Sequence, residues 1–385
     1  MLSEKSRPVI EATLPLVGSR IGEITADFYS RLFAAHPELL DGLFSRSNQW
    51  SGDQQRALAG SIAAFATHLV NNPGTLPEKV LARIAHKHAS LGIAEEQYAV
   101  VYEHLFAAIA ADLADVITPE IAEAWTEVYW LMADALIKLE KDLYAAQANT
   151  KMWMPWRVVS KEAAGRDSMT FTLEPADDTP VTEAKPGQYV SVKVTLPDGL
   201  RQVRQYSLSG DTGTSRIFTT KLNDGGEVST ALHTAVEPGD ILDISNPYGE
   251  ITLKDGDGPV VLASAGIGCT PTASILRSLA EADTERQVLV LHAERSIDSW
   301  ALSGQMREDA AKIDAKLTLW LETPHAGANE GFMSLREVDL PADASLYLCG
   351  PLPFMKKIRD EAIEAGIPST RIHYEVFGPD VWLAN

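Results

Sequence analysis

The stretch Trp-Met-Pro-Trp at residues 153–156 marks the point at which the 385-residue sequence changes its character. Before it, residues 1–150 hold 7 of the 26 glycines, and apolar residues recur at spacings of three and four, as in Ile62, Phe65 and Leu69. After it come short β-rich runs separated by Gly, Pro and Asp. The sequence therefore predicts an all-α first part followed by a part built on strands.

The strand-rich part divides again near residue 258. Before that residue, the runs 188–194, 202–208, 217–222 and 241–245 predict a small antiparallel barrel. Beyond it, buried-strand runs alternate with helical segments, which favours a parallel sheet with right-handed crossovers. We therefore expect a multidomain protein with an all-α domain over 1–147, an antiparallel β-barrel domain over 148–257 and an α/β parallel-sheet domain over 258–385.

Composition limits the classes of protein to which the chain can belong. The 33 Lys and Arg against 53 Asp and Glu leave a net charge of −20, which repels phosphate backbones and anionic lipid surfaces. The two cysteines, Cys269 and Cys349, cannot form a disulfide framework or a Cys-rich metal site. Neither a signal-peptide run nor an uninterrupted apolar run of about 18 residues is present. We expect a cytoplasmic protein with no nucleic-acid partner and no stable membrane insertion.

Three polar side chains in the helical part fall on helix faces that are otherwise apolar. In the segment 77–90, a step of four from Ile84 carries the apolar face to His88, whereas His86 falls on the solvated side. Tyr98 and Glu140 likewise fall on apolar faces of their helices. If one of the two histidines is a metal ligand, it is His88.

These three residues together fit the surroundings of a metal-bound imidazole. Such an imidazole needs a partner for its second nitrogen, and an inward carboxylate supplies one. Taken singly, each residue has an ordinary interpretation: His88 as a satisfied core histidine, Tyr98 as a half-buried aromatic and Glu140 as a side chain that reaches back to water. Both interpretations stay open on the pattern alone.

The helical part resembles a globin of the bacterial flavohaemoglobin family, the nitric oxide dioxygenases. Besides Tyr98 and Glu140, the motifs that carry the resemblance are Phe28-Tyr29, Ser47-Asn48-Gln49, Asp53-Gln54, Leu58 and Lys87-His88. The resemblance implies haem b, with His88 as the proximal ligand of the iron and Tyr98 and Glu140 around it. It also implies Tyr29 and Gln54 over bound dioxygen, Phe28 against the haem and Leu58 as the apolar distal contact.

The run Arg-Gln-Tyr-Ser at 204–207 ends a strand, so that its Arg and Tyr lie on one face. An Arg can pair with a pyrophosphate, an aromatic ring can lie against a flavin, and a Ser can bond a ring nitrogen. Downstream, a glycine pair at 225–226 precedes a helix, whose N–H groups and dipole favour phosphate. A hairpin turn followed by an ordinary helix is the alternative interpretation.

This region resembles the FAD-binding barrel of the ferredoxin reductase superfamily, which carries R-x-Y-S followed by G-G-x-x-S. The resemblance implies bound FAD. The residues that it implies around the flavin are Tyr189, Arg204, Gln205, Tyr206 and Ser207, with Val228 and Ser229 at the pyrophosphate.

The glycine-rich turn at 264–271 follows a buried strand and opens a helix, the setting in which a turn can hold a pyrophosphate. A purely structural turn is the alternative, and Cys269 within it is interpreted as a small buried residue. By resemblance to the reductases, the residues implied in nucleotide binding are Gly266, Gly268, Thr270 and Pro271, then Cys349, Gly350 and Pro351 on the nicotinamide side. Glu375 and Phe377 are implied near the flavin, with Phe377 covering its ring.

The choice of nicotinamide cofactor depends on the residues that follow the second strand of the last domain. Arg295 could pair with the 2′-phosphate of NADPH, whereas the adjacent Glu294 would repel it. The sequence therefore favours NADH, with NADPH left open.

The family resemblance, which runs in the order globin, FAD barrel and NAD domain, implies a nitric oxide dioxygenase: NAD(P)H reduces FAD, FAD reduces haem iron one electron at a time, and haem-bound O2 oxidises NO to nitrate. O2 and NO would be the substrates. The resemblance also allows lipid or azole-type ligands in the distal pocket, and we expect a monomer. Two alternatives stay open: NAD(P)H-dependent reduction of other acceptors, such as hydroperoxides or quinones, and an oxygen-binding sensor or store kept ferrous by its reductase.

Overall fold

The computed structural model describes residues 1–210, 213–341 and 343–378, apart from the side chains of residues 47, 48 and 50. The predicted motif side chains of Ser47 and Asn48 thus lie outside the described part. The chain forms two compact units. Unit 1 holds Met1–Met152 with Pro197–Val203 and Gly378, and unit 2 holds Trp153–Leu196 with Arg204–Phe377.

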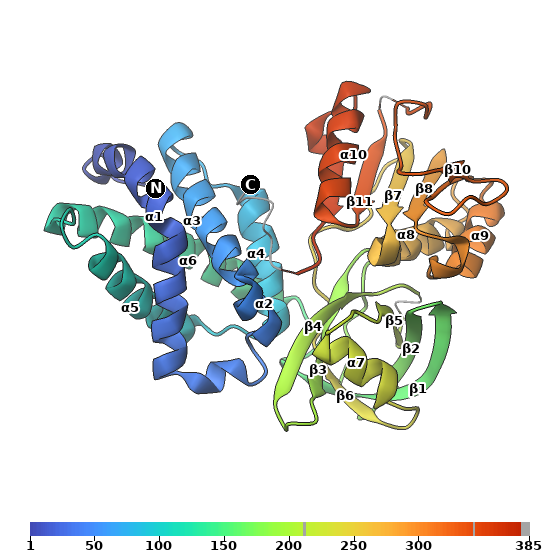
Figure 1. The fold of residues 1–385 in the computed structure, drawn as a ribbon, viewed down its shortest axis with the longest axis horizontal. Helices are drawn as coiled ribbons and strands as arrows, with labels where there is room; N and C mark the ends of the chain where they lie inside the picture. The colour runs from blue at the N-terminus through green and yellow to red at the C-terminus, as the bar shows by residue number, and fades with distance from the viewer. Residues whose placement is uncertain (211–212, 342, 379–385) are drawn as a thin grey trace. The chain divides into compact units, whose positions relative to one another are not determined.

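Residues 1–152 of unit 1 form six α-helices (Figure 1). They are α1 (Ser6–Ala35), α2 (Arg46–Ser51), α3 (Asp53–Asn71), α4 (Glu78–Leu91), α5 (Glu95–Asp112) and α6 (Pro119–Ala145), with a short 3-10 helix η1 (Pro37–Leu40). Helix α1 packs against α3, α5 and α6, and α4 packs against α6. The predicted all-α architecture is confirmed. No helix among the described residues has both the length and the apolar character needed to cross a membrane.

Local signals set the ends of the helices that carry the predicted iron ligand, His88, and its predicted carboxylate partner, Glu140. The Thr118 hydroxyl accepts the Ile121 N–H at 3.3 Å and Pro119 occupies the first helical position, so α6 begins there. Helix α4 ends before Gly92, whose φ of +79° suits glycine and closes the helix with a hydrogen bond to Ala89 O. These ends fix the positions of His88 and Glu140 along their helices.

The first part of unit 2 is an antiparallel sheet of six strands in the order β4-β3-β6-β1-β2-β5. The strands are β1 (Met154–Gly165), β2 (Ser168–Pro175), β3 (Tyr189–Thr195), β4 (Arg201–Ser207), β5 (Arg216–Lys221) and β6 (Ile241–Ile244), with helix α7 (Glu227–Thr234). A bridge between Leu208 and Phe218 joins the two ends of the sheet, as a barrel requires. The predicted antiparallel domain is confirmed, and β1 and β2 are strands that the runs named above did not include.

The second part of unit 2 is a parallel sheet in the order β10-β9-β8-β7-β11-β12. Its strands are β7 (Val260–Ala265), β8 (Val288–Glu294), β9 (Lys316–Leu321), β10 (Asn329–Glu330), β11 (Ser345–Cys349) and β12 (Ile372–Glu375). Its helices are α8 (Cys269–Glu281), α9 (Ser303–Lys312) and α10 (Leu352–Glu364), with short 3-10 turns η2 (Gly266–Gly268), η3 (Ile297–Ser299) and η4 (Ser369–Arg371). The strand order reverses between β7 and β11, and ligands of such sheets bind at this point. The predicted α/β domain is confirmed.

The barrel core is centred on a stack of three aromatic rings. Phe218 is fully buried, and its ring stacks on Phe171 at 5.4 Å and on Tyr206 at 5.3 Å. Phe218 thereby connects the core to the strand that carries the predicted flavin residues.

We expect Phe218→Ala to lower the free energy of unfolding of unit 2 by about 3–5 kcal/mol, because it leaves a cavity between two rings. Chemical denaturation followed by tryptophan fluorescence measures this change. Phe332→Ala is the matched control, because Phe332 is 80% exposed and should lose almost nothing. Equal stability of the two variants would contradict the central place of Phe218.

Candidate functional site

Three helices bring His88, Tyr98 and Glu140 together inside unit 1. His88 Nδ1 lies 2.8 Å from Glu140 Oε1 and 3.0 Å from the Tyr98 hydroxyl, and that hydroxyl donates to the same carboxylate oxygen at 2.6 Å. Glu140 is 2% exposed and Tyr98 is 7% exposed. The inward orientations of Tyr98 and Glu140 are as the helical pattern predicts, so Tyr98 is not a half-buried aromatic and Glu140 does not reach back to water. The hydrogen bonds of His88 fit both a satisfied core histidine and a metal ligand. His86, which was expected on the solvated side, is half-buried.

The proximal cluster leaves the other imidazole nitrogen available to a metal. Because Nδ1 of His88 is held by Glu140, Nε2 is the atom that can bind iron, and a carboxylate on Nδ1 strengthens such a ligand. Burial, and after it the Glu140 carboxylate, raise the pKa of Tyr98, so its hydroxyl stays protonated and keeps donating. The donor set therefore fits a haem whose iron takes one histidine ligand.

Tyr129 also holds Tyr98 in position, and the sequence pattern did not predict this role. The Tyr129 hydroxyl on α6 donates to the backbone carbonyl of Tyr98 at 2.6 Å. Tyr129 is half-buried. It stands next to Val128 in a helix rich in apolar residues, so the sequence pattern did not distinguish it from its neighbours.

The predicted distal residues Tyr29 and Gln54 lie next to each other. Tyr29 is 5% exposed among the rings of Phe28, Phe33 and Phe44, with ring centroids 4.7–5.9 Å away. Burial raises the pKa of Tyr29, and a hydrogen bond with the Gln54 side chain offsets part of that effect. A protonated phenol with an amide beside it is a ready donor. Leu58, one turn further along α3, is half-buried against the same core.

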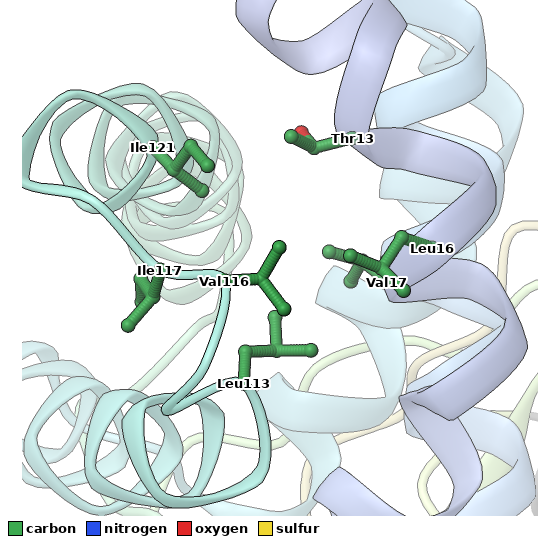
Figure 2. Close-up of a pocket in the computed structure, with 7 residues that line it drawn as sticks. All are labelled: Thr13, Leu16, Val17, Leu113, Val116, Ile117 and Ile121. Carbon is green, nitrogen blue, oxygen red and sulfur yellow. The ribbon is translucent and has the colours of Figure 1, made fainter.

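A small apolar pocket in unit 1 lies apart from these residues (Figure 2). Figure 2 shows side chains of α1 facing those of the connection between α5 and α6 and of the first turn of α6 across it. The lining residues are Thr13, Leu16, Val17, Leu113, Val116, Ile117 and Ile121. The Thr13 hydroxyl donates to Val9 O at 2.7 Å and accepts from Trp125 Nε1 at 3.0 Å, so it offers little to a polar ligand. None of the predicted site residues lines this pocket.

In unit 2, the strand β4 carries the predicted flavin residues. Ser207 is 4% exposed, and its hydroxyl oxygen has no hydrogen-bond partner among the described residues. Such a buried orphan atom fits a strand-end serine that bonds a flavin nitrogen. Burial lowers the pKa of the Arg204 guanidinium, whereas Tyr206 and Glu227 raise it. The Tyr206 ring uses one face on Phe218, and Gln205 donates to Ser191 Oγ at 3.0 Å.

The glycine pair before α7 forms a tight loop that is closed by Ser229. The Ser229 hydroxyl donates to Gly226 O at 3.1 Å and accepts the Asn223 N–H at 3.2 Å. A Cβ at Gly226 would lie 2.6 Å from that hydroxyl oxygen, so glycine fits best. The backbone N–H groups at the start of α7, those of Val228 and Ser229, are then the groups suited to a phosphate. Tyr189, the first residue of β3, forms an antiparallel bridge with Tyr248.

Two loops of the parallel sheet touch where the strand order reverses. Cys349 pairs in register with Ser264 on β7 and with Glu375 on β12. A Cβ at Gly268 would lie 2.4 Å from the Cys349 carbonyl oxygen, so only glycine allows this approach. Gly266 has a φ of +56°, and Thr270 and Pro271 open α8 behind it. Gly350 and Pro351 follow on the other loop, which leads into α10.

Burial shifts the pKa values of two thiols and one histidine near these loops toward the neutral form of each group. Burial raises the pKa of Cys269 to about 12 and also raises the pKa of Cys349. Cys269 is fully buried, as expected of a small core residue. His292, which sequence reasoning did not single out, lies with Nδ1 2.9 Å from Ser264 Oγ, and burial lowers its pKa to about 3. Phe377, by contrast, is 45% exposed and so offers an open ring.

Comparison with known proteins matches all three parts of the chain. Residues 26–136 match the globin family, residues 155–253 the oxidoreductase FAD-binding domain and residues 262–360 the oxidoreductase NAD-binding domain. Curated relatives include a flavohemoprotein of Rhizobium meliloti (strain 1021), 39% identical over 99% of this chain and 100% of that protein. The flavohemoprotein of Bordetella pertussis is 40% identical over 98% of this chain and 99% of its own length. The chain belongs to the flavohemoprotein family.

Solved structures agree with membership of the flavohemoprotein family. The flavohemoglobin of Malassezia yamatoensis, solved with bound FAD and heme, superposes with a TM-score of 0.94 at 45% identity, covering 98% of this chain and all of that one. The FAD/NAD-binding domain of a nitric oxide dioxygenase from Vibrio cholerae superposes with a TM-score of 0.57 at 32% identity, covering 60% of this chain and all of that one. This flavohemoprotein therefore takes haem, FAD and a nicotinamide nucleotide, and passes electrons from reductase to globin.

We expect His88→Ala to abolish haem retention in this flavohemoprotein, because it removes the imidazole that Glu140 and Tyr98 orient, whereas His86→Ala retains haem. The ratio of Soret to flavin absorbance after purification measures the difference. Haem loss from the His86 variant with retention by the His88 variant would overturn the assignment.

Proposed function

We propose that this flavohemoprotein is a nitric oxide dioxygenase that uses NADH, FAD and haem to convert NO and O2 to nitrate. The observation that carries the proposal is a buried tyrosine with an amide beside it, Tyr29 and Gln54, in a globin unit that has a histidine held by a carboxylate. A gas-storing globin has no need of the attached reductase for each turnover, whereas an oxidation of NO consumes electrons continuously. The Vibrio cholerae match, whose protein is named a nitric oxide dioxygenase, supports the same reading.

On the proximal side, His88 would hold the iron through Nε2. Glu140 would fix the proton on Nδ1, and Tyr98, as a second donor to the same carboxylate oxygen, would hold that oxygen in place. The carboxylate raises the electron density that the imidazole gives to the metal. Haem, when bound, supplies the centre at which dioxygen and NO react, and the flavin divides the two electrons of a hydride into single electrons.

On the distal side, the Tyr29 hydroxyl would donate a hydrogen bond to the reacting oxygen. Its raised pKa keeps the proton on the phenol, and Gln54 restricts the direction in which the hydroxyl points. A donor fixed before the reaction stabilises developing negative charge without reorganisation. Phe28 and Leu58 would keep the surroundings apolar, which suits entry of NO.

In unit 2, Arg204 and the N–H groups of Val228 and Ser229 would bind the FAD pyrophosphate, and the orphan hydroxyl of Ser207 would bond the flavin ring. Tyr189, Gln205 and Tyr206 would surround the flavin, with Glu375 and Phe377 near its ring. Gly266, Gly268, Thr270 and Pro271 would hold the nucleotide phosphates. Cys349, Gly350 and Pro351 would line the nicotinamide side with a neutral thiol.

We expect Tyr29→Phe to slow NADH-dependent NO consumption roughly a hundredfold, as the loss of one fixed donor does elsewhere. Reduction of FAD by NADH should be unchanged, since unit 2 is untouched. An NO electrode and anaerobic stopped-flow absorbance at the flavin band measure the two rates. Unchanged NO consumption would contradict the distal role, and stable O2 binding without NO turnover in the parent protein would favour an oxygen store.

The preference for NADH is proposed to come from Glu294, the last residue of β8. Glu294 is 8% exposed, one carboxylate oxygen accepts the Arg295 N–H at 2.9 Å, and the other lies 3.9 Å from the position of a Cβ on Gly266. An acidic residue at this strand end can bond a ribose 2′-hydroxyl but repels a 2′-phosphate.

We expect Glu294→Gln to raise the ratio of kcat/KM for NADPH to that for NADH about tenfold, since it removes a repulsion on the order of 1 kcal/mol. Initial rates of flavin reduction with each nucleotide measure the ratio. Glu322→Gln, which neutralises a nearby exposed carboxylate, is the control and should change the ratio little. Equal effects of both variants would show that the preference comes from the overall negative charge of this region and not from a specific contact of Glu294 with the nucleotide.

A further inference from the structure

Unit 1 contains a cluster of oxidisable rings on α5 and α6 that the proposed function does not use. The Tyr102 ring centroid lies 4.4 Å from Phe106, 5.3 Å from Tyr129 and 5.5 Å from Trp130. The rings of Tyr129 and Trp130 are 5.3 Å apart and perpendicular. All four residues are half-buried, so the cluster lies where the core of unit 1 meets its surface.

The cluster continues inward to the proximal histidine. The Tyr129 hydroxyl donates to the Tyr98 backbone carbonyl at 2.6 Å, and the Tyr98 ring centroid lies 6.1 Å from that of His88. Each step from His88 to Trp130 is thus a hydrogen bond or a ring contact. Tyrosine and tryptophan lose single electrons more readily than phenylalanine or aliphatic residues, and an electron crosses such short steps easily.

We propose that Tyr98, Tyr129, Tyr102 and Trp130 form an electron relay between the haem and the surface of unit 1. The relay would give the protein a second activity: reduction of hydrogen peroxide with electrons from small external donors such as phenols, independently of NADH. The proposal rests on haem held by His88 and not on the reaction with NO.

The residues of the relay have two different roles: some only pass an electron on, and others form the stable radical. The Tyr129 hydroxyl is bound to a carbonyl, which is not a base, and the Tyr98 hydroxyl is bound inside the proximal cluster. These two rings therefore act as bridges. Tyr102 shares a hydrogen bond of 3.0 Å with the Thr126 hydroxyl, and both Tyr102 and Trp130 reach water, so either can release a proton when oxidised.

The electron balance closes with the peroxide and the external donor alone. Reduction of one hydrogen peroxide molecule to two water molecules takes two electrons and two protons at the haem. Each electron leaves Tyr102 or Trp130, which loses one proton to water and becomes a neutral radical. A phenol then restores each radical by transfer of one hydrogen atom, so two phenols are oxidised for each peroxide.

The test uses the full holoprotein, loaded with haem and FAD, without NADH and with hydrogen peroxide. Rapid-freeze EPR records the ring radical, and peptide mass spectrometry locates oxidation on residues 102 and 130. We expect the double variant Tyr102→Phe, Trp130→Phe to lose the EPR signal and the phenol oxidation that accompanies it. Haem loading, read from the Soret band, and NADH-dependent haem reduction should be unchanged, because among the described residues neither side chain forms a hydrogen bond or ring contact with His88, Tyr98 or Glu140.

Tyr144→Phe is the matched control. Tyr144 also lies on α6 and its hydroxyl donates to a carbonyl, that of Ile93 at 2.8 Å, but it is not in the ring cluster. The control should keep the radical signal and the oxidation of residues 102 and 130. A signal of full intensity in the double variant, loss of the signal in the control, or no ring radical in the parent protein would each overturn the proposal. NO consumption measured on the same samples reports separately on the proposed dioxygenase.

Discussion

One carboxylate oxygen, Oε1 of Glu140, fixes the geometry on which the haem side of this protein depends. It receives His88 Nδ1 at 2.8 Å and the Tyr98 hydroxyl at 2.6 Å in a place that is almost closed to water. Each of the three groups comes from a different helix, α4, α5 or α6. The direction of the imidazole is therefore set by the packing of the whole bundle, and a local change in α4 alone cannot reset it.

Helical periodicity predicted this cluster well, because it relates neighbours in sequence to one face of a helix. It placed His88, Tyr98 and Glu140 on inward helix faces. Periodicity could not predict that the three side chains contact one another, because that depends on how the helices pack. Tyr29 and Gln54 came from family resemblance alone, since Gln54 stands in a polar stretch beside the start of α3. The role of Tyr129 could not be predicted from the sequence, because its hydroxyl bonds a backbone carbonyl, and every residue has one.

The strand-rich part was predicted in outline and missed in two places. Strands β1 and β2 are the longest of the barrel, but the apolar alternation of β1 ends after Val158, where Ser160, Lys161 and Glu162 follow. The parallel strands were clearer, because strands buried on both faces read as continuous apolar runs. The contact of Gly268 with the Cys349 carbonyl joins residues far apart in sequence, so the motifs were visible but their contact was not.

That contact has a consequence for how the nucleotide-binding lobe can be altered. The two loops approach so closely that the backbone of one forms part of the wall of the other, with no side chain between them to absorb an adjustment. A glycine turn grafted from another reductase would have a backbone path that fits the partner loop of its own protein. It would not fit the 349–351 loop of this one. The two loops are therefore a single exchangeable module, and redesign of this lobe has to move them together.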